Sequence, residues 1–508
     1  MLFNSYEFIF IFLPFSLFAY YSILRYFSNT SAVYFLVVAS LFFYGWWDYR
    51  YIPIIISSIM FNYYIGLSIQ RSLSRPILVF GIFLNLALLG YFKYVSFFMD
   101  NINLVLDAGI SFQEIALPLA ISFFTFQQIA YLVDSYKDKV NPISLREYSL
   151  FVLFFPQLIA GPIVHHKEMM PQFLEHKKAY FNYQMFVTGL FLFALGLFKK
   201  VVIADNIALF STPVFLAAEA GFDLSLWEAW GGALAYTFQL YFDFSGYADM
   251  AIGAALLFGI KLPLNFWSPY KSINIIEFWR RWHMTLSSFL KDYIYIPLGG
   301  SRSGELIKYK NLMITMLLGG LWHGAGWNFV IWGGLHGIYL LINHIWIRMT
   351  NNRDFLPSSF NWLGLFISWT TTFIAIVFAW VFFRAESVNG AFEMISSMIQ
   401  FSDLANAKEI LYAIQTGSEV GHFGSATGYL FIIALIATVV IMPNSTEIVH
   451  ALDQKTALGL GNFKKPQTLS ILSAVLKVHS LTIPVLAGCF VTSILLLTRV
   501  TEFIYFRF

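Results

Sequence analysis

Residues 318–326 read LGGLWHGAG, and they place a histidine, His323, in the middle of a strongly apolar stretch. A titratable ring inside a membrane span is costly to bury, so it is by default a candidate functional residue. Gly319 and Gly320 remove side chains next to Trp322, which lets another backbone or a ligand approach closely and eases helix packing in lipid. The alternative is a core histidine bonded to a neighbouring helix. The flanking glycines and Trp322 favour a site.

The whole chain has the composition of a membrane protein. Of its 508 residues, 58% are hydrophobic and 12% are charged, whereas a soluble domain has about 25% charged residues. The net charge of +3 and the lack of a basic stretch argue against a nucleic-acid partner. A single cysteine excludes an internal disulfide bond. We therefore predict an all-α, polytopic membrane protein whose surroundings are mostly lipid.

Apolar runs of about 17–25 residues are candidate membrane spans. Such runs lie near residues 8–25, 31–47, 51–68, 76–92, 115–133, 147–165, 182–204, 227–259, 308–330, 329–347, 361–383, 427–443 and 482–499. The run 227–259 is too long for one simple span, so we expect it to be broken, tilted or re-entrant. The more polar stretches 384–426 and 444–480 are expected to lie outside the membrane.

The basic residues indicate an orientation. Arg71 and Arg75 follow the third apolar run, and Lys137 and Lys139 follow the fifth. Lysine and arginine favour the cytoplasmic side of a membrane. The N-terminus is therefore predicted to lie outside the cytoplasm.

A second histidine, His283, lies forty positions before the first, in EFWRRWHMTLSSFLKDYIYIPLGG at 277–300. On a helix, Glu277 reaches Arg280 and Arg281 at i+3 and i+4, and Arg280 and His283 share a face. Two arginines at membrane depth favour an anionic partner such as a phosphate. A basic cluster that meets anionic lipid headgroups explains them equally well.

The run QLYFDFSGYADMAIG, residues 239–253, carries two carboxylates. Helical spacing puts Asp243 and Tyr247 on one face, while Asp249 points elsewhere. Carboxylates in an apolar run need partners, and we expect the arginines of 277–300 to supply them. This interpretation makes the carboxylates structural rather than catalytic.

No pattern in the chain predicts a metal site. His323 and His336 are 13 positions apart, and His336 and His344 are eight apart. Neither an H-E-x-x-H motif nor a Cys/His box is present, and a Walker A motif and a G-x-S-x-G motif are also missing. His165 and His166 precede a lysine and are predicted to be solvated residues at the membrane edge.

Taken together, these segments resemble the membrane-bound O-acyltransferase (MBOAT) family. The resemblance is closest to its bacterial AlgI/PatA-like branch, which acts in alginate and peptidoglycan acetylation, and more distant to DltB of teichoic-acid D-alanylation. It covers roughly residues 1–390, and its ordered combination of stretches is specific although no single stretch is. The stretches are MLFNSYEFIFIFLP, SLFFYGWWDYRY, LLGYFKY, LPLAISFFTFQQIAYLVDSY, FFPQLIAGPIV, LGLFKKVVIADN, AYTFQLYFDFSGYADMAIG, LNFWSPYKSINIIEFWRRWHMTLSSFLKDYIYIPLGG, LLGGLWHGAGWNFVIWGGLHG and VFFRAES.

The resemblance implies the MBOAT fold, with about 11–13 transmembrane or re-entrant helices around a central tunnel. It implies an acyltransferase membrane core over residues 1–390. Residues 391–508 would form a branch-specific C-terminal region with extramembrane stretches and about two further transmembrane helices. The expected location is the bacterial cytoplasmic (inner) membrane, crossed several times.

The resemblance also assigns roles to residues. The family's catalytic histidine maps onto His323, which would act as general base. Its second functional position maps onto His283, which would orient the acyl carrier or stabilise the developing oxyanion. The candidates for binding the acyl donor are Arg280, Arg281 and Trp322, and the candidates for lining the tunnel are Asp243, Tyr247, Trp279 and Trp282.

The function implied by the resemblance is an enzymatic acetyl relay. Acetyl-CoA would be the donor on the cytoplasmic side, with no metal, and the acceptor would be an extracytoplasmic polysaccharide such as alginate or peptidoglycan. The implied partner is an extracytoplasmic SGNH-type acetyltransferase, similar to AlgJ, AlgX or PatB. Two alternatives are an acyltransferase that acts directly on a lipid or protein, and a non-catalytic transporter of an acylated species. The lack of an internal repeat argues against the transporter.

Overall fold

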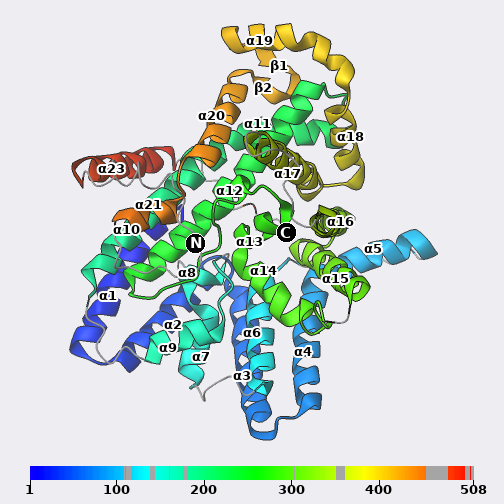
Figure 1. Cartoon of the computed structure of the whole chain (residues 1–508). Helices are drawn as coiled ribbons and strands as arrows, with labels where there is room; N and C mark the ends of the chain where they lie inside the picture. The colour runs from blue at the N-terminus through cyan, green and yellow to red at the C-terminus, as the bar shows by residue number, and fades with distance from the viewer. Residues whose placement is uncertain are drawn as a thin grey trace. The chain divides into compact units, whose positions relative to one another are not determined.

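The computed structural model describes residues 1–107, 109, 116–137, 144–159, 161–174, 181–302, 304–350, 361–452, 479–497 and 504. Within these ranges the chain is almost entirely helical (Figure 1). The strands assigned there are the two-residue β1 (Glu419–Val420) and β2 (Gly424–Ser425), which pair antiparallel with Glu419 opposite Ser425. The prediction of an all-α protein is confirmed.

The chain divides into two compact units that alternate along the sequence. Unit 1 comprises Met1–Leu197, Tyr247–Leu264 and Ile448–Arg507, and unit 2 comprises Phe198–Gly246, Asn265–Glu447 and Phe508. Residues 391–447 thus belong to the same unit as the histidine segments. The division of the chain at residue 390, expected from the sequence, stays a prediction.

Unit 1 contains the N-terminal helices and two C-terminal ones. Their bounds are η1 Glu7–Phe12, α1 Leu13–Tyr26, α2 Asn29–Gly45, η2 Tyr49–Tyr51, α3 Ile52–Ser72, α4 Arg75–Leu89, η3 Gly90–Tyr94, α5 Val95–Leu106, α6 Ile121–Tyr136, α7 Leu145–Leu153, α8 Phe155–Leu158, α9 His166–Leu174, α10 Tyr183–Phe198, α21 Ser445–Leu452 and α23 His479–Leu496. Within this unit α3, α4 and α6 lie side by side (Figure 1).

Unit 2 contains the helices that carry the predicted site. Their bounds are η5 Lys199–Ala204, α11 Asp205–Glu219, η6 Pro269–Lys271, α13 Ile275–Arg281, α14 Met284–Leu290, η7 Lys291–Tyr295, α15 Glu305–His323, α16 Trp327–Thr350, α17 Asn361–Arg384, α18 Val388–Met398, η9 Phe401–Asn406, α19 Ala407–Thr416, η10 Gly421–Phe423 and α20 Thr427–Ile441. The helix α12 (Leu226–Leu257) contributes residues to both units, and so do α10, whose last residue is in unit 2, and α21, which begins in unit 2.

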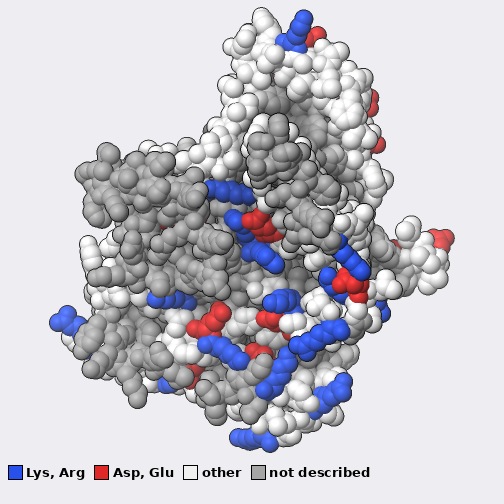
Figure 2. All heavy atoms as spheres, in the orientation of Figure 1, with Lys and Arg blue, Asp and Glu red and all other residues white. Residues whose placement is uncertain are grey.

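Six helices of the described chain are long and apolar enough to cross a membrane. They are Glu7–Tyr26, Tyr49–Ser72, Arg75–Leu106, Tyr183–Glu219, Trp327–Thr350 and Trp362–Arg384, and the shorter apolar helices are Asn29–Gly45, Thr427–Ile441 and Leu486–Leu496. On the face that Figure 2 shows, Lys and Arg side chains often lie beside Asp or Glu side chains, and the rest of the described surface is uncharged. A multi-pass membrane protein is the architecture that these features support.

The long apolar run 227–259 forms one unbroken helix. α12 has 32 residues, which at 1.5 Å per residue is about 48 Å and exceeds the roughly 30 Å of a bilayer core. Most of its side chains are buried inside the protein. The run was expected to be broken, tilted or re-entrant, and the expectation of a broken helix is wrong.

The apolar run around His323 also ends earlier than the sequence suggested. α15 stops at His323, Gly324 is extended, and α16 begins at Trp327, so His323 lies where the chain passes from one helix to the next. The helices α15 and α16 pack side by side (Figure 1). A Cβ atom on Gly320 would overlap the Phe329 carbonyl oxygen. The close backbone approach predicted for the glycines is confirmed at Gly320, whereas Gly319 meets the side chain of Leu290.

The pair Gly333 and Gly334 gives a test of this close approach. A Cβ on Gly333 would overlap the carbonyl oxygen of Met316, whereas one on Gly334 would meet only Leu317 Cδ2 at 3.7 Å. Gly333→Ala should destabilise the purified protein by about 1–3 kcal/mol through overpacking, seen as a lower midpoint in a detergent thermal melt. Gly334→Ala should not lower it. Equal midpoints for the two variants would show that the helices separate freely.

Candidate active site

His283 lies at a break between two short helices of unit 2. α13 ends at Arg281, Trp282 is extended, and His283 adopts a left-handed backbone with φ 42° and ψ 54° as the N-cap of α14. Such a conformation is uncommon outside glycine and is often associated with a functional site. Because the helix ends first, Arg280 and His283 do not share a helical face, and that expectation is wrong.

Asn265 fixes the orientation of the His283 ring. Its Oδ1 accepts hydrogen bonds from the Thr285 backbone N–H at 3.3 Å and the Thr285 hydroxyl at 2.9 Å, and His283 Nδ1 lies 3.1 Å from the same oxygen. A backbone N–H only donates, so the shared atom is the amide oxygen and His283 Nδ1 must donate to it. In the neutral ring the lone pair is therefore on Nε2.

His283 is a neutral ring in this environment. Its exposed fraction is 0%, and the edge of Phe244 packs against it with ring centroids 4.8 Å apart. His283 lies outside the six candidate spans, and burial lowers its pKa to about 3 because the charged form loses its hydration. At physiological pH the ring can accept a hydrogen bond through Nε2, but it is a weak base.

The structure brings His323 next to His283. The two imidazole centroids are 6.4 Å apart, although the residues are forty positions apart in sequence. His323 is 3% exposed, and the rings of Trp322, Trp332 and Phe383 lie 4.9, 5.0 and 5.1 Å from its ring. The result is one buried site with two imidazoles and an aromatic wall.

The predicted donor-binding residue Trp322 belongs to this wall. It is 4% exposed, and its ring lies 4.9 Å from His323 and 6.2 Å from His283. The indole therefore contacts both imidazoles. This position suits a residue beside the reacting group better than one that binds a nucleotide at the protein surface.

The two tryptophans proposed to line a tunnel pack among the aromatic rings around the site, Trp279 on Trp332 and Trp282 on Trp380. Trp282 is 1% exposed and packs on Trp380 at 4.9 Å. Trp279 is partly exposed, and its indole N–H donates to Nδ1 of His336, 3.3 Å away. The sequence pattern gave His336 no role other than that of a possible metal ligand. Among the described residues, no group of three or more metal-ligating side chains is found.

The two arginines differ in their surroundings. Arg281 Nη2 is 2.6 Å from Glu277 Oε1, and its Nη1 donates to the Trp267 carbonyl oxygen at 3.4 Å. Arg281 therefore braces α13 against the preceding loop. Arg280 is exposed, and it lies with Lys308 within electrostatic range of His344. Arg280 is thus the better placed of the two to meet an anionic ligand.

Asp243 finds a different partner from the one expected. Lys200 Nζ lies 2.6 Å from Asp243 Oδ1 and 2.8 Å from Asp205 Oδ1, and Lys200 and Asp243 are both about 1% exposed. The expectation that the arginines of 277–300 neutralise Asp243 is wrong. A lysine within the apolar run 182–204 was the available signal, since a charge at membrane depth needs a partner.

Tyr247 and His166 lie in unit 1. Tyr247 is buried and stacks on Phe3 with ring centroids 4.8 Å apart. His166 is 4% exposed, and its Nδ1 lies 3.4 Å from Asp134 Oδ2. The expectation that His166 is solvated is wrong, because the chain after the Gly-Pro pair at 161–162 turns back into the unit rather than out into water.

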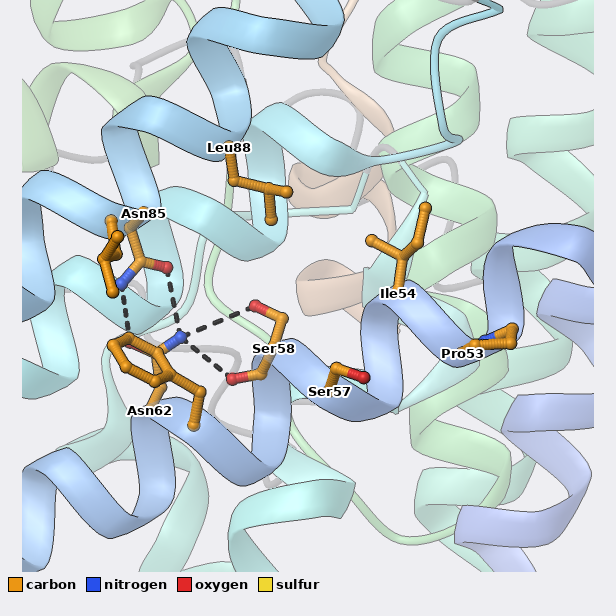
Figure 3. A pocket seen from close by; sticks show the side chains of 9 residues that line it. Pro53, Ile54, Ser57, Ser58, Asn62, Asn85 and Leu88 are labelled. Atoms are coloured by element: carbon orange, nitrogen blue, oxygen red, sulfur yellow. Dashed lines mark hydrogen bonds between the residues drawn. The ribbon is translucent and has the colours of Figure 1, made fainter.

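Unit 1 also contains a groove between α3 and α4, with a volume of about 380 Å³ (Figure 3). Its floor is polar, since Asn62 and Asn85 exchange hydrogen bonds at 3.1 and 2.6 Å, and Asn62 also donates to the Ser58 carbonyl oxygen at 2.9 Å. Its rim is mainly apolar, as at Leu84 and Leu88. The two amides satisfy each other's hydrogen bonds, so we interpret this groove as part of the packing between α3 and α4 and not as a ligand site.

The chain is similar to known membrane acyltransferases. Residues 79–383 match the family model described as "MBOAT, membrane-bound O-acyltransferase family". The peptidoglycan O-acetyltransferase of Helicobacter pylori is 48% identical over 433 residues, which is 78% of this chain and 80% of the relative. The probable alginate O-acetylase AlgI of Pseudomonas putida is 40% identical over 430 residues, covering 83% and 84% of the two chains.

A more distant relative is the teichoic acid D-alanyltransferase of Streptococcus thermophilus. It is 30% identical over 282 residues, which is 51% of this chain and 67% of the relative. Both histidines, His283 and His323, fall within the residues that match the family model.

Proposed function

The chain belongs to the membrane-bound O-acyltransferase family, and from this premise we propose that it is the membrane component of an acetyl relay. It is an acyltransferase with several membrane spans. In the proposal it takes acetyl from acetyl-CoA on the cytoplasmic side of a bacterial cytoplasmic (inner) membrane. It then passes the group on for O-acetylation of an extracytoplasmic polysaccharide. The relatives that act on peptidoglycan and alginate support this substrate class.

The observation that carries the proposal is the buried pair of imidazoles. In acyl transfer an oxygen–carbon bond forms between the acceptor hydroxyl and the acetyl carbonyl, and the carbon–sulfur bond of the thioester breaks. His323 removes the hydroxyl proton and returns it to the departing thiolate. His283 accepts a hydrogen bond through Nε2 from an amide N–H of the pantetheine arm and so orients the acyl carrier, since its Nδ1–H is held by Asn265. His283 is thus engaged with Asn265 and the acyl carrier, and the proposal assigns the base role to His323.

Replacement of His323 tests the base assignment. His323→Gln should reduce acetyl transfer about 10²–10⁴-fold, the usual contribution of a general base. The measurement is the release of free CoA by protein in liposomes. His422→Gln is the matched control, because His422 is exposed and its ring packs on Phe222 instead. A folded His323→Gln variant with the wild-type rate would end the proposal for this site.

Arg280 is proposed to bind the CoA phosphates. A charge-assisted hydrogen bond contributes about 1.5–3 kcal/mol, so Arg280→Ala should raise the KM for acetyl-CoA about tenfold or more. With S-acetylpantetheine, which lacks the nucleotide phosphates, the variant and the wild type should have equal KM values. Arg25→Ala is a control, since Arg25 is an exposed arginine of unit 1 beside Tyr26. An unchanged KM for acetyl-CoA would leave Arg280 as a lipid-headgroup contact.

A relay also needs an acceptor outside the cell. We propose an extracytoplasmic SGNH-type acetyltransferase, similar to AlgJ, AlgX or PatB, as the partner, and an extracytoplasmic N-terminus for this chain. Liposomes with acetyl-CoA inside and polysaccharide outside should yield acetylated polymer only when the partner is added outside. Polymer acetylation without the partner, or acetylated lipid as the main product, would contradict this part. An N-terminal epitope tag should be reached by antibody on intact spheroplasts.

A further inference from the structure

His336 is a buried histidine of α16 that the proposed chemistry does not yet use. Its exposed fraction is 0%. It lies one helical turn after Trp332, with the two ring centroids 4.8 Å apart. Trp332 in turn lies edge-on against the His323 ring, at 5.0 Å and 87°. His336 is therefore separated from the proposed base by a single indole.

The Trp279 hydrogen bond determines which nitrogen of His336 carries the proton. An indole N–H can only donate, so the Nδ1 atom that it meets at 3.3 Å must be the acceptor. In a neutral imidazole the proton is then on Nε2. His336 thus presents an N–H donor, the opposite polarity to the Nε2 lone pair of His283.

Two buried donors on this face of α16 lack an acceptor. Among the described residues, neither His336 Nε2 nor Trp332 Nε1 has a hydrogen-bond partner. An unsatisfied buried donor costs about 1–3 kcal/mol. The two donors lie on adjacent rings, and one of these rings, Trp332, contacts the His323 imidazole.

The chemistry of acyl transfer supplies such an atom. As the acceptor oxygen adds to the acetyl carbonyl, negative charge develops on the carbonyl oxygen, and buried N–H donors stabilise it. His283 cannot serve in the tautomer that Asn265 holds, because its Nε2 is an acceptor. Neither the base, His323, nor the orienting ring, His283, thus donates to the oxyanion in the proposed chemistry.

We propose that His336 Nε2–H and Trp332 Nε1–H bind the carbonyl oxygen of the acyl group and stabilise the oxyanion during its transfer. This inference rests on the proposed function. The donors hold the oxygen while the new carbon–oxygen bond forms. When the tetrahedral intermediate collapses, the carbon–sulfur bond breaks and the thiolate takes the proton from His323.

Kinetics of three variants test the donors. His336→Leu removes the N–H and should lower kcat about 10²–10³-fold, the usual effect of losing one oxyanion donor, with little change in KM. His336→Gln can place an amide N–H near the same point and should lose clearly less. Trp332→Phe keeps a ring but not the donor and should also lower kcat. His422→Gln again serves as the control.

A spectroscopic measurement separates hydrogen bonding from packing. A ketone analogue of acetyl-CoA, with a methylene between sulfur and a ¹³C-labelled carbonyl, is bound to wild type and variants. Its infrared carbonyl band should lie at lower wavenumber in wild type and His336→Gln than in His336→Leu. A merely structural histidine would give the same band in all three proteins, together with equal losses of thermal stability in both His336 variants.

The outcomes distinguish this inference from the proposed function. If wild-type protein releases no CoA from acetyl-CoA, the proposed function fails and this inference falls with it. If wild type is active and His323→Gln is not, but folded His336→Leu keeps the wild-type kcat and carbonyl band, only the oxyanion site is overturned.

Discussion

A polar side chain that is buried in a protein is stabilised when it finds its hydrogen-bond partners within the protein. Asn265 shows how this constraint shapes the active-site region. Its single amide oxygen accepts from Thr285 twice and from His283 once. That arrangement determines the tautomer of a histidine whose backbone has already left the helical conformation. The polarity of the site thus depends on one side chain outside the histidine segment.

The same constraint accounts for polar clusters elsewhere. Lys200 is flanked by Asp205 and Asp243, and Asn62 exchanges hydrogen bonds with Asn85. Burying a cation without a carboxylate, or an amide without a hydrogen-bond partner, would cost several kcal/mol of folding free energy. The N–H groups of Trp332 and His336 are among the buried groups without a hydrogen-bond partner in the described residues. They are polar groups that the fold brings to the imidazoles without supplying an acceptor.

Backbone proximity provides the second requirement of the site. Gly320 and Gly333 let α15 and α16 approach to a distance that no Cβ atom would allow. This approach brings Trp332 of α16 against His323 at the end of α15. In lipid no hydrophobic force drives helices together, and small residues at the contact let their backbones approach closely. In this protein the glycines also set the geometry of a chemical site.

The amino-acid sequence by itself determined the class of the protein. Hydropathy over long windows predicts helices in lipid, and His323 between glycines predicts a buried functional ring, because both depend on local composition. The partners of the polar groups were decided only by the tertiary structure. Asp243 pairs with Lys200 rather than an arginine, and Trp279 bonds to His336, 57 positions away. Side chains distant in sequence become neighbours only when the helices pack, and hydropathy does not determine which helices contact each other.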